Sequence, residues 1–172
     1  MKALISRGAR LTVMTLGFAG LIISVNAIPS GATDAVGFAG SVVARGTDKS
    51  DVNLRIEEGL DIVVTLTPVH PGDKSGWHAH PGGAIVVLGC VPIALPALCK
   101  SEITTYVPVG KHCRQTTYHQ GDSFIERPGQ TLMAVNTGST NTIIYATFPN
   151  VPVGVKGGQR IDRDQPKHCP IL

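Results

Sequence analysis

The segment Pro71-Gly-Asp-Lys-Ser-Gly-Trp-His-Ala-His-Pro-Gly-Gly83 carries the strongest pattern in this sequence. Side chains two residues apart on a β-strand point to the same face, so His78 and His80 would present two imidazoles to one side. Two imidazoles placed in this way can share one metal ion. The same spacing also lets the two rings hydrogen-bond to each other or to nearby backbone. Spacing alone therefore leaves a metal site and a structural role both open.

Short strand-like runs, separated by turns rich in Gly and Pro, extend on both sides of this segment. Their regular spacing favours a β-sandwich or β-barrel. After the N-terminal region, no segment shows the sustained apolar stripe of a long helix. The sequence therefore predicts a single all-β domain whose strands include Val42–Val43, Ile62–Leu66, Ile85–Leu88, Ile103–Val107, Ser123–Glu126, Thr131–Val135 and Thr142–Phe148.

Two motifs in this region resemble those of the cupin family. The first is Gly72, five residues, His78-Ala79-His80 and Pro81-Gly82; the second is Gly121-Asp-Ser-Phe-Ile-Glu-Arg-Pro-Gly129, running on to Asn136. They occur in the family's order, and Gly76-Trp-His-Ala-His-Pro-Gly82 is similar to a subgroup of small, single-domain cupins, many of them exported. The resemblance implies an all-β, cupin-type jelly-roll β-barrel with both histidines pointing into its mouth.

The metal ligands of the family are only partly present. A typical cupin site uses two His and one Glu from the first motif and one His from the second. Here the Glu position is Ala84 and the second His position is Leu132. A divalent ion (Mn, Fe, Ni, Cu or Zn) held by His78 and His80 alone would be weakly bound and would need water or a ligand to complete its shell.

Three residues could replace the missing ligands. Glu126 lies beside the second motif on a predicted strand, and His70 and His119 lie near predicted strand ends. Nothing in the sequence places any of them near His78. Glu126 could instead form a surface pair with Arg127 or Arg114, so it remains a speculative third ligand.

The N-terminal region has the features of a secretory signal. Lys2, Arg7 and Arg10 precede an uncharged run and the small residues Val25-Asn-Ala27, a spacing typical of signal peptidase sites. We therefore expect a signal peptide at 1–27, a flexible leader at 28–35, a cupin barrel at 36–150 and a C-terminal tail at 151–172. Cleavage would leave 12 of the 15 basic residues against 12 acidic ones. The mature chain is then expected to be secreted or periplasmic, with no affinity for nucleic acid and no membrane anchor.

Four cysteines in an exported chain suggest disulfides. The pairing of neighbours in sequence joins Cys90 to Cys99 and Cys113 to Cys169, and the second bond would fasten the tail to the barrel. Free buried thiols are the alternative. Residues 90–120 would then form an ordered, disulfide-bonded loop that could lie over the barrel mouth. The tail would run over the surface without joining a sheet.

Two functions are compatible with these features. The sequence favours an exported, non-catalytic module that binds a small molecule, and loosely a metal, through His78 and His80. The alternative is a metal-dependent enzyme, dioxygenase- or isomerase-like, acting on a small oxygenated substrate. A hydrophobic ligand would suit a lining of Leu132, Ala134, Ile144 and Ala146, although these residues could simply fill a collapsed core. Trp77 is expected to pack on the opposite face, and the resemblance implies that a homodimer could form.

Overall fold

The computed structural model describes residues 42–90 and 100–169 of the chain. Within these ranges the chain forms ten β-strands and no helix, which confirms the all-β prediction. No helix in the described ranges is long and apolar enough to cross a membrane. The predicted signal peptide, the leader and Cys99 lie outside the described residues, so the expectations for them stay predictions.

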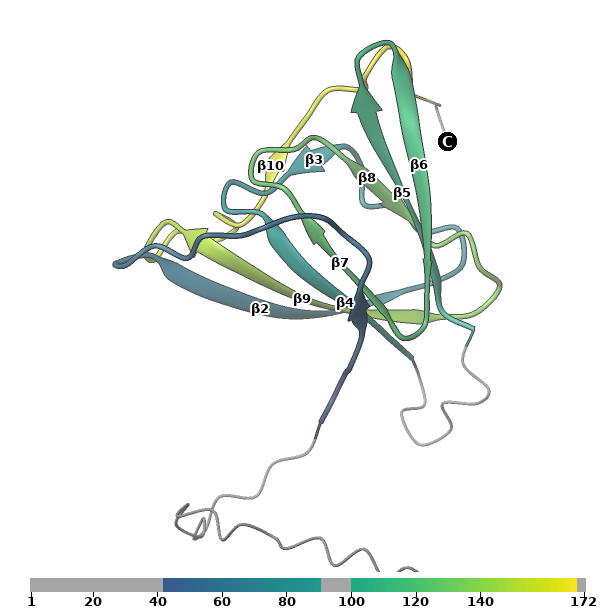
Figure 1. Cartoon of the computed structure of the whole chain (residues 1–172), viewed down its shortest axis with the longest axis horizontal. Coiled ribbons are helices and arrows are strands. Elements are labelled where there is room, and N and C mark those ends of the chain that lie inside the picture. Colours follow the sequence, from purple (N-terminus) through teal and green to yellow (C-terminus); the bar gives the residue numbers. More distant parts are fainter. Residues whose placement is uncertain (1–41, 91–99, 170–172) are drawn as a thin grey trace, which may run out of the picture. The chain divides into compact units, whose positions relative to one another are not determined.

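The larger sheet has five strands (Figure 1). Neighbouring strands are antiparallel, except that Thr47–Asp48 pairs in parallel with the strand that begins at Asp122. In spatial order they are β1 (Thr47–Asp48), β7 (Asp122–Glu126), β4 (Ala84–Cys90), β9 (Thr142–Val151) and β2 (Asp61–Val69). β4 and β9 lie next to each other inside the sheet, and Ala84, Val86 and Leu88 of β4 are buried, whereas Ile85 between them is exposed.

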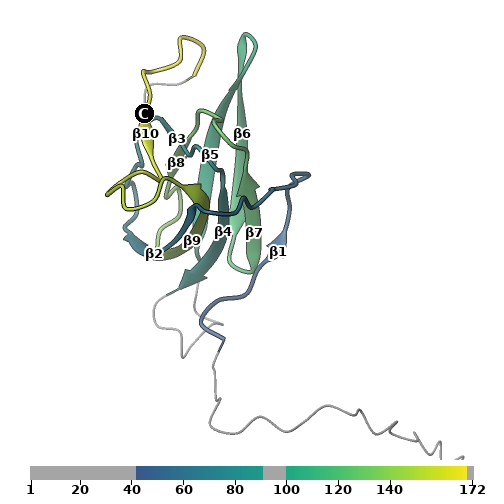
Figure 2. The ribbon, with the colours of Figure 1, turned by 90° about the vertical axis from the view of Figure 1, so that its left-hand side faces the viewer.

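Two smaller antiparallel sheets complete the fold (Figure 2). The three-stranded sheet contains β6 (His112–His119), β5 (Glu102–Val109) and β8 (Met133–Val135). The two-stranded sheet pairs β3 (His78–Ala79) with β10 (Ile161–Asp162).

The main core lies between the two larger sheets. Strands of both sheets alternate inward and outward side chains, and the inward apolar ones meet in a single cluster. Ile103 of β5 is fully buried there against residues of the larger sheet, which are Ala84, Val86, Leu88, Phe124, Ala146, Phe148 and Val151. This arrangement of facing sheets confirms the prediction of an all-β sandwich or barrel.

Most of the predicted strands are present, but two expectations are wrong. Val42 and Val43 are exposed and lie in no strand. The region 90–120 is not a loop over the mouth in its described part, because Glu102–Val109 and His112–His119 pair as a β-hairpin of the three-stranded sheet. The strand His112–His119 was missed because its polar residues face solvent on the edge of that sheet, so it lacks the apolar signal of a buried strand.

The outer face of the three-stranded sheet is covered by the tail and by Trp77. Tyr106, Met133 and Val135 point away from the main core, yet they are buried in a second cluster with Trp77 and Cys169. Trp77 Nε1 donates a hydrogen bond to Gln165 Oε1 at 2.6 Å. The packing role expected for Trp77 is therefore confirmed.

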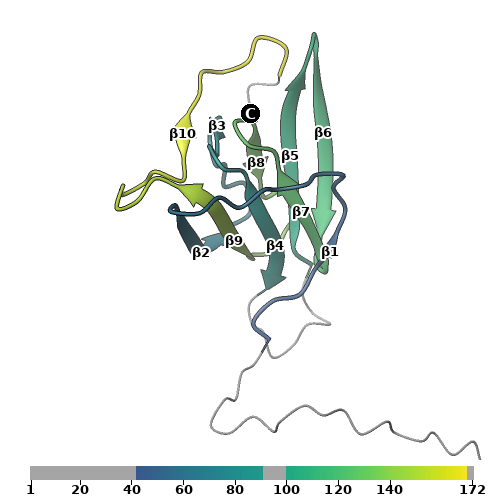
Figure 3. The ribbon, with the colours of Figure 1, turned by 60° about the vertical axis from the view of Figure 1, so that its left-hand side comes forward.

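A disulfide and a strand pairing are among the bonds that hold the tail against the barrel. A disulfide joins Cys113 of β6 to Cys169, as predicted, whereas Cys99 lies outside the described residues. The tail also forms β10 beside β3 (Figure 3), with Ile161 opposite Ala79 and Asp162 opposite His78. The expectation that the tail joins no sheet is therefore wrong, because the short strand that carries the histidines has an open edge that β10 fills.

Removing the disulfide should destabilise the folded protein. The bond closes a loop between residues 56 apart in sequence. In the chain-entropy description, its loss in a Cys113→Ser/Cys169→Ser double variant lowers the free energy of unfolding by about 4 kcal/mol. Urea denaturation of both proteins without reductant measures the difference, and a loss below about 1 kcal/mol would contradict the expectation.

Candidate metal centre

β3 places His78 and His80 at the open end of the barrel. His78 and Leu132 exchange two backbone hydrogen bonds, of 2.9 and 2.8 Å, which hold β3 against the second motif. The carbonyl of His80 accepts hydrogen bonds from the amides of Gly83 and Gly129. Both imidazoles are buried, and their rings meet edge to face with centroids 4.8 Å apart.

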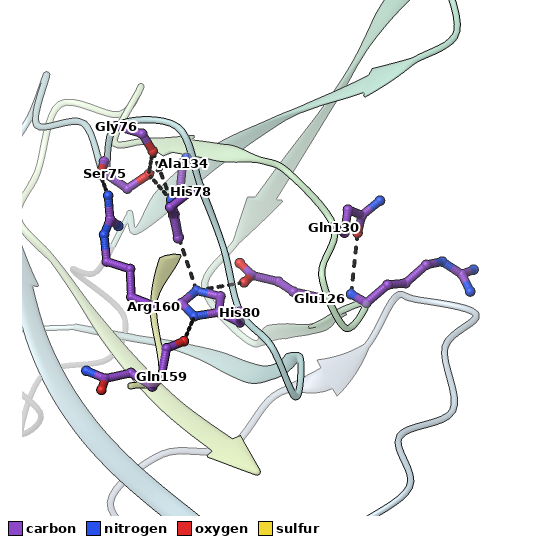
Figure 4. Close-up of polar contacts among 10 residues, drawn as sticks. Ser75, Gly76, His78, His80, Glu126, Gln130, Ala134, Gln159 and Arg160 are labelled. Atoms are coloured by element: carbon purple, nitrogen blue, oxygen red, sulfur yellow. Dashed lines mark hydrogen bonds and ion pairs between the residues drawn. The ribbon is translucent and has the colours of Figure 1, made fainter. Parts of the chain in front are cut away.

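Hydrogen bonds to backbone carbonyls orient both rings (Figure 4). Nδ1 of His78 lies 2.9 Å from the carbonyl oxygen of Gly76, and Nδ1 of His80 lies 2.6 Å from that of Gln159. A carbonyl oxygen can only accept, so Nδ1 carries the proton in each ring. The Nε2 atoms of the neutral rings are therefore acceptors, and they face each other at 3.1 Å.

Glu126 enters the same space from β7. It lies directly opposite Ala84 of β4 in the antiparallel pair, so the two residues share one face of the sheet. Gly83, which precedes Ala84, has a φ of +80°, and a Cβ there would lie 2.5 Å from the carbonyl oxygen of Glu126. Only glycine permits this tight approach. The turn 81–83 thus fixes β4 against the strand that carries the carboxylate.

The three side chains form a group that could hold a metal ion. Oε2 of Glu126 lies 3.2 Å from Nε2 of His80, and one ligand atom from each of the three residues lies within 4.8 Å of the others. Metal–ligand bonds of about 2.0–2.2 Å separate adjacent ligand atoms by roughly 2.9–3.5 Å, which matches the shorter contacts. Oε2 is buried without a hydrogen-bond partner, as expected of an atom placed to bind a cation. The residues present therefore fit a divalent metal.

Burial controls the protonation of the group. It lowers the pKa of His78 to about 4, against a smaller opposing effect of its hydrogen bond to Gly76, and it also lowers the pKa of His80. Burial raises the pKa of Glu126 to about 8. At neutral pH without metal, the two imidazoles are thus neutral and the carboxyl holds a proton. A metal ion would take the place of that proton.

The other candidate ligands lie elsewhere. His70 is exposed and its Nδ1 lies 3.1 Å from Asp73, whereas the exposed His119 has its Nδ1 3.7 Å from Glu102. Of the residues that the structure describes, the set that could hold a metal includes neither of them. The surface alternative for Glu126 is not realised: its side chain is 9% exposed, and the guanidinium of Arg127 bonds the carbonyl of Asp51 instead.

A cavity of about 300 Å³ opens onto this group. Of the four residues predicted to line this cavity, three do so, namely Ala134, Ile144 and Ala146. Leu132 does not line it; it is buried and pairs with the backbone of His78. Sequence reasoning missed the tail residues Gln159 and Arg160, which also line the cavity. No local motif marks them, and the predicted disulfide at Cys169 was the only sign that the tail is held near the barrel.

Comparisons with known proteins find weak likenesses of fold. No protein-family model and no curated protein matches the sequence. Among solved structures, peruvianin-I, a cysteine peptidase from Thevetia peruviana latex, matches at 19% identity and a TM-score of 0.40, over 53% of this chain and 52% of its own. Oxalate decarboxylase from Bacillus subtilis, a protein with Mn(II) centres, matches at 18% identity and a TM-score of 0.42, over 53% of this chain and 22% of its own.

A third likeness is to a protein with a double-stranded β-helix domain from Klebsiella pneumoniae, at 22% identity and a TM-score of 0.39, over 59% of this chain and 92% of its own. The chain thus spans about half of the length of peruvianin-I and under a quarter of that of the decarboxylase. The likenesses do not bear on the site, whose interpretation rests on its own geometry.

The metal-free protein should be most stable near pH 6.5 and lose about 1 kcal/mol of unfolding free energy by pH 8, because the loss from Glu126 is partly offset by the two buried histidines, which deprotonate in the unfolded chain over the same interval. Glu126 ionises near 4.5 in the unfolded chain but only near 8 when folded, so over this interval the unfolded state binds fewer protons and stability falls as pH rises. Below pH 6.5 the lowered pKa values of the buried histidines oppose this trend.

Urea denaturation in the presence of a chelator measures this profile. The Glu126→Gln variant should lack the fall between pH 6.5 and 8, because it has no carboxyl to ionise. A wild-type protein whose stability stays level or rises over that interval would show that Glu126 is already ionised when folded.

Proposed function

We propose that this protein is an exported cupin that holds a divalent transition metal on His78, His80 and Glu126 and presents it to a small molecule in the adjoining cavity. The carrying observation is that three buried acceptor atoms face one another without a donor between them when the carboxylate is ionised. Acceptors so arranged repel one another unless a cation lies among them. A bound metal would supply that positive charge and act as a Lewis acid toward the ligand.

The number of protein ligands changes the expected affinity. Two imidazoles alone would hold a metal weakly, but a carboxylate makes three ligands, the number usual in catalytic metal sites. Leu132 stands where the resemblance would place a fourth. The remaining positions around the ion would therefore be filled by water or by the small molecule.

Export is proposed on two grounds. The sequence pattern of residues 1–27 is that of a signal peptide, and the Cys113–Cys169 disulfide is a bond typical of oxidising compartments. In such a compartment the bond would persist and keep the tail beside the metal ligands. No nucleic acid or membrane partner is proposed, and the homodimer suggested by the cupin resemblance stays a proposal.

The same ligand set favours a second function, a metal-dependent enzyme. Two histidines and one carboxylate on one side of an ion are the ligands of many non-haem Fe(II) oxygenases. The absence of a carboxylate in the first motif counts against this function in the sequence, but the position of Glu126 removes that objection. Substrate-dependent oxygen consumption by the Fe(II)-loaded protein, measured with an oxygen electrode, would separate an enzyme from a binding module.

Metal analysis tests the main proposal. Purified wild-type protein, incubated with excess Mn²⁺ or Zn²⁺ and then desalted, should retain about one equivalent by elemental analysis. The His78→Ala/His80→Ala variant should retain less than about a tenth of an equivalent, because both nitrogen ligands are gone. His119→Ala is the matched control, since this exposed histidine lies outside the site, and it should behave as wild type. Wild-type protein that takes up no metal would refute the proposal.

A carboxylate exchange tests the role of Glu126. The Glu126→Ala variant should bind metal at least about tenfold more weakly than wild type. Because Ala84 and Glu126 face each other on the same side of two paired strands, the double variant Ala84→Glu/Glu126→Ala should recover most of the affinity. Titration with Zn²⁺ against a competing chelator measures all three. Unchanged affinity in Glu126→Ala would show that the carboxylate is not a ligand.

A further inference from the structure

The tail places one cationic side chain at the cavity. Arg160 precedes β10 and lines the same cavity as the three metal-binding residues. Its Nη2 donates to the carbonyl of Ser75 at 2.9 Å and its Nε to Oδ1 of Asp162 at 2.8 Å. Figure 4 shows the side chain running beside His80 toward Ser75. These bonds hold the guanidinium at the rim of the cavity.

The guanidinium of Arg160 keeps hydrogen-bonding capacity beyond these two bonds. Arginine has five N–H donors, and the two bonds above use one on Nε and one on Nη2. Both donors of Nη1 and the second donor of Nη2 remain. An Nη1–Nη2 pair can bind the two oxygens of one carboxylate in a bidentate arrangement.

The charge balance of the cavity favours an anion. Among the described residues that line the cavity, Glu126 is the only acidic one, and the metal would neutralise its charge. Asp162 bonds Arg160, but the Asp162 side chain is 84% exposed whereas that of Arg160 is 35% exposed. Water therefore screens the carboxylate of Asp162 more than the guanidinium. A divalent ion and Arg160 together would leave the cavity with net positive charge.

Much of the remaining wall is apolar, although Thr65 and Thr67 of β2 also line the cavity. Below the polar rim, the strands of the larger sheet and β8 contribute aliphatic and aromatic side chains, namely Val86, Phe124, Ala134, Ile144, Ala146 and Phe148. The volume of about 300 Å³ is at the low end of the range for small-molecule sites. The cavity would thus suit a compact apolar body attached to the anionic group.

We propose that the ligand is a small organic carboxylate with an apolar body, and that Arg160 is the residue that selects for its carboxylate. The inference rests on the proposed function, since the metal-binding residues form one end of the same cavity. The anionic group would accept hydrogen bonds from Nη1 and Nη2 of Arg160, and the body would lie against the apolar wall. The specificity of a barrel site would then depend on the C-terminal tail.

Calorimetric titration of the Zn²⁺-loaded full-length protein tests this inference with three probes of known chemistry. Benzoate carries both features, acetate lacks the apolar body, and benzyl alcohol lacks the charge. Benzoate should bind at least about tenfold more tightly than either of the others. Benzoate binding that is undetectable, or no tighter than that of benzyl alcohol, would overturn the inference.

Variants separate Arg160 from the metal. Arg160→Gln should lose at least about tenfold in affinity for benzoate and keep its metal content and its affinity for benzyl alcohol, a pattern that a collapsed tail would not produce. Arg160→Lys should have an intermediate affinity for benzoate, because lysine keeps the positive charge but lacks the paired donors of a planar guanidinium. Arg163→Gln is the matched control, since its exposed side chain lies on the same tail and outside the cavity lining.

The outcomes distinguish the two proposals. Arg160→Gln protein that binds benzoate within twofold of wild type would overturn the role of Arg160 and leave the metal site standing. Protein that takes up no Zn²⁺ but still binds benzoate through Arg160 would refute the proposed metal function and support this inference alone.

Discussion

The mutual approach of three buried acceptor atoms is the constraint around which the rest of this structure is arranged. Nε2 of His78 and Nε2 of His80 lie 3.1 Å apart, and Oε2 of Glu126 is 3.2 Å from the second. Holding such atoms together costs free energy, because they are desolvated and, once Glu126 is ionised, of like polarity. The surrounding hydrogen bonds supply the necessary restraint: carbonyls fix each ring through Nδ1, and the pairing of β4 with β7 fixes the carboxylate.

The fold could be predicted from the sequence because its signals are local. Alternating apolar residues, turns with Gly and Pro, and the His-x-His spacing each depend on neighbours a few residues away. The third member of the site depends on register. Glu126 meets His80 because β7 pairs with β4 so that Ala84 lies opposite Glu126. A strand pairing between segments some forty residues apart in sequence leaves no local trace, so Glu126 could be named only as one candidate among three.

The tail was the other feature that sequence reasoning could not place. Its Gly, Pro and charged residues have the composition of a surface segment, and most of them are exposed. Its structure follows from bonds to partners far along the chain, which include the disulfide to Cys113 and the pairing of β10 with β3. Because the carbonyl of Gln159 orients the ring of His80, the tail belongs to the candidate metal site. The disulfide then restrains the geometry of the site as well as the stability of the fold.

The departures from the cupin motifs are better described as a rearrangement than as a loss. Ala84 and Leu132 remove two expected ligands, and taken residue by residue this suggests a degraded site. In the paired sheet, however, a carboxylate on the neighbouring strand reaches the space beside Ala84, since directly opposed residues lie only about 5 Å apart. Leu132 has no such substitute among the described residues, because the described metal-binding set has three members. A metal held there would keep one protein ligand fewer than a four-ligand cupin site and one more position for a ligand, and the cavity opens on the same group. Under the proposed function, such a site would exchange some metal affinity for access by a small molecule.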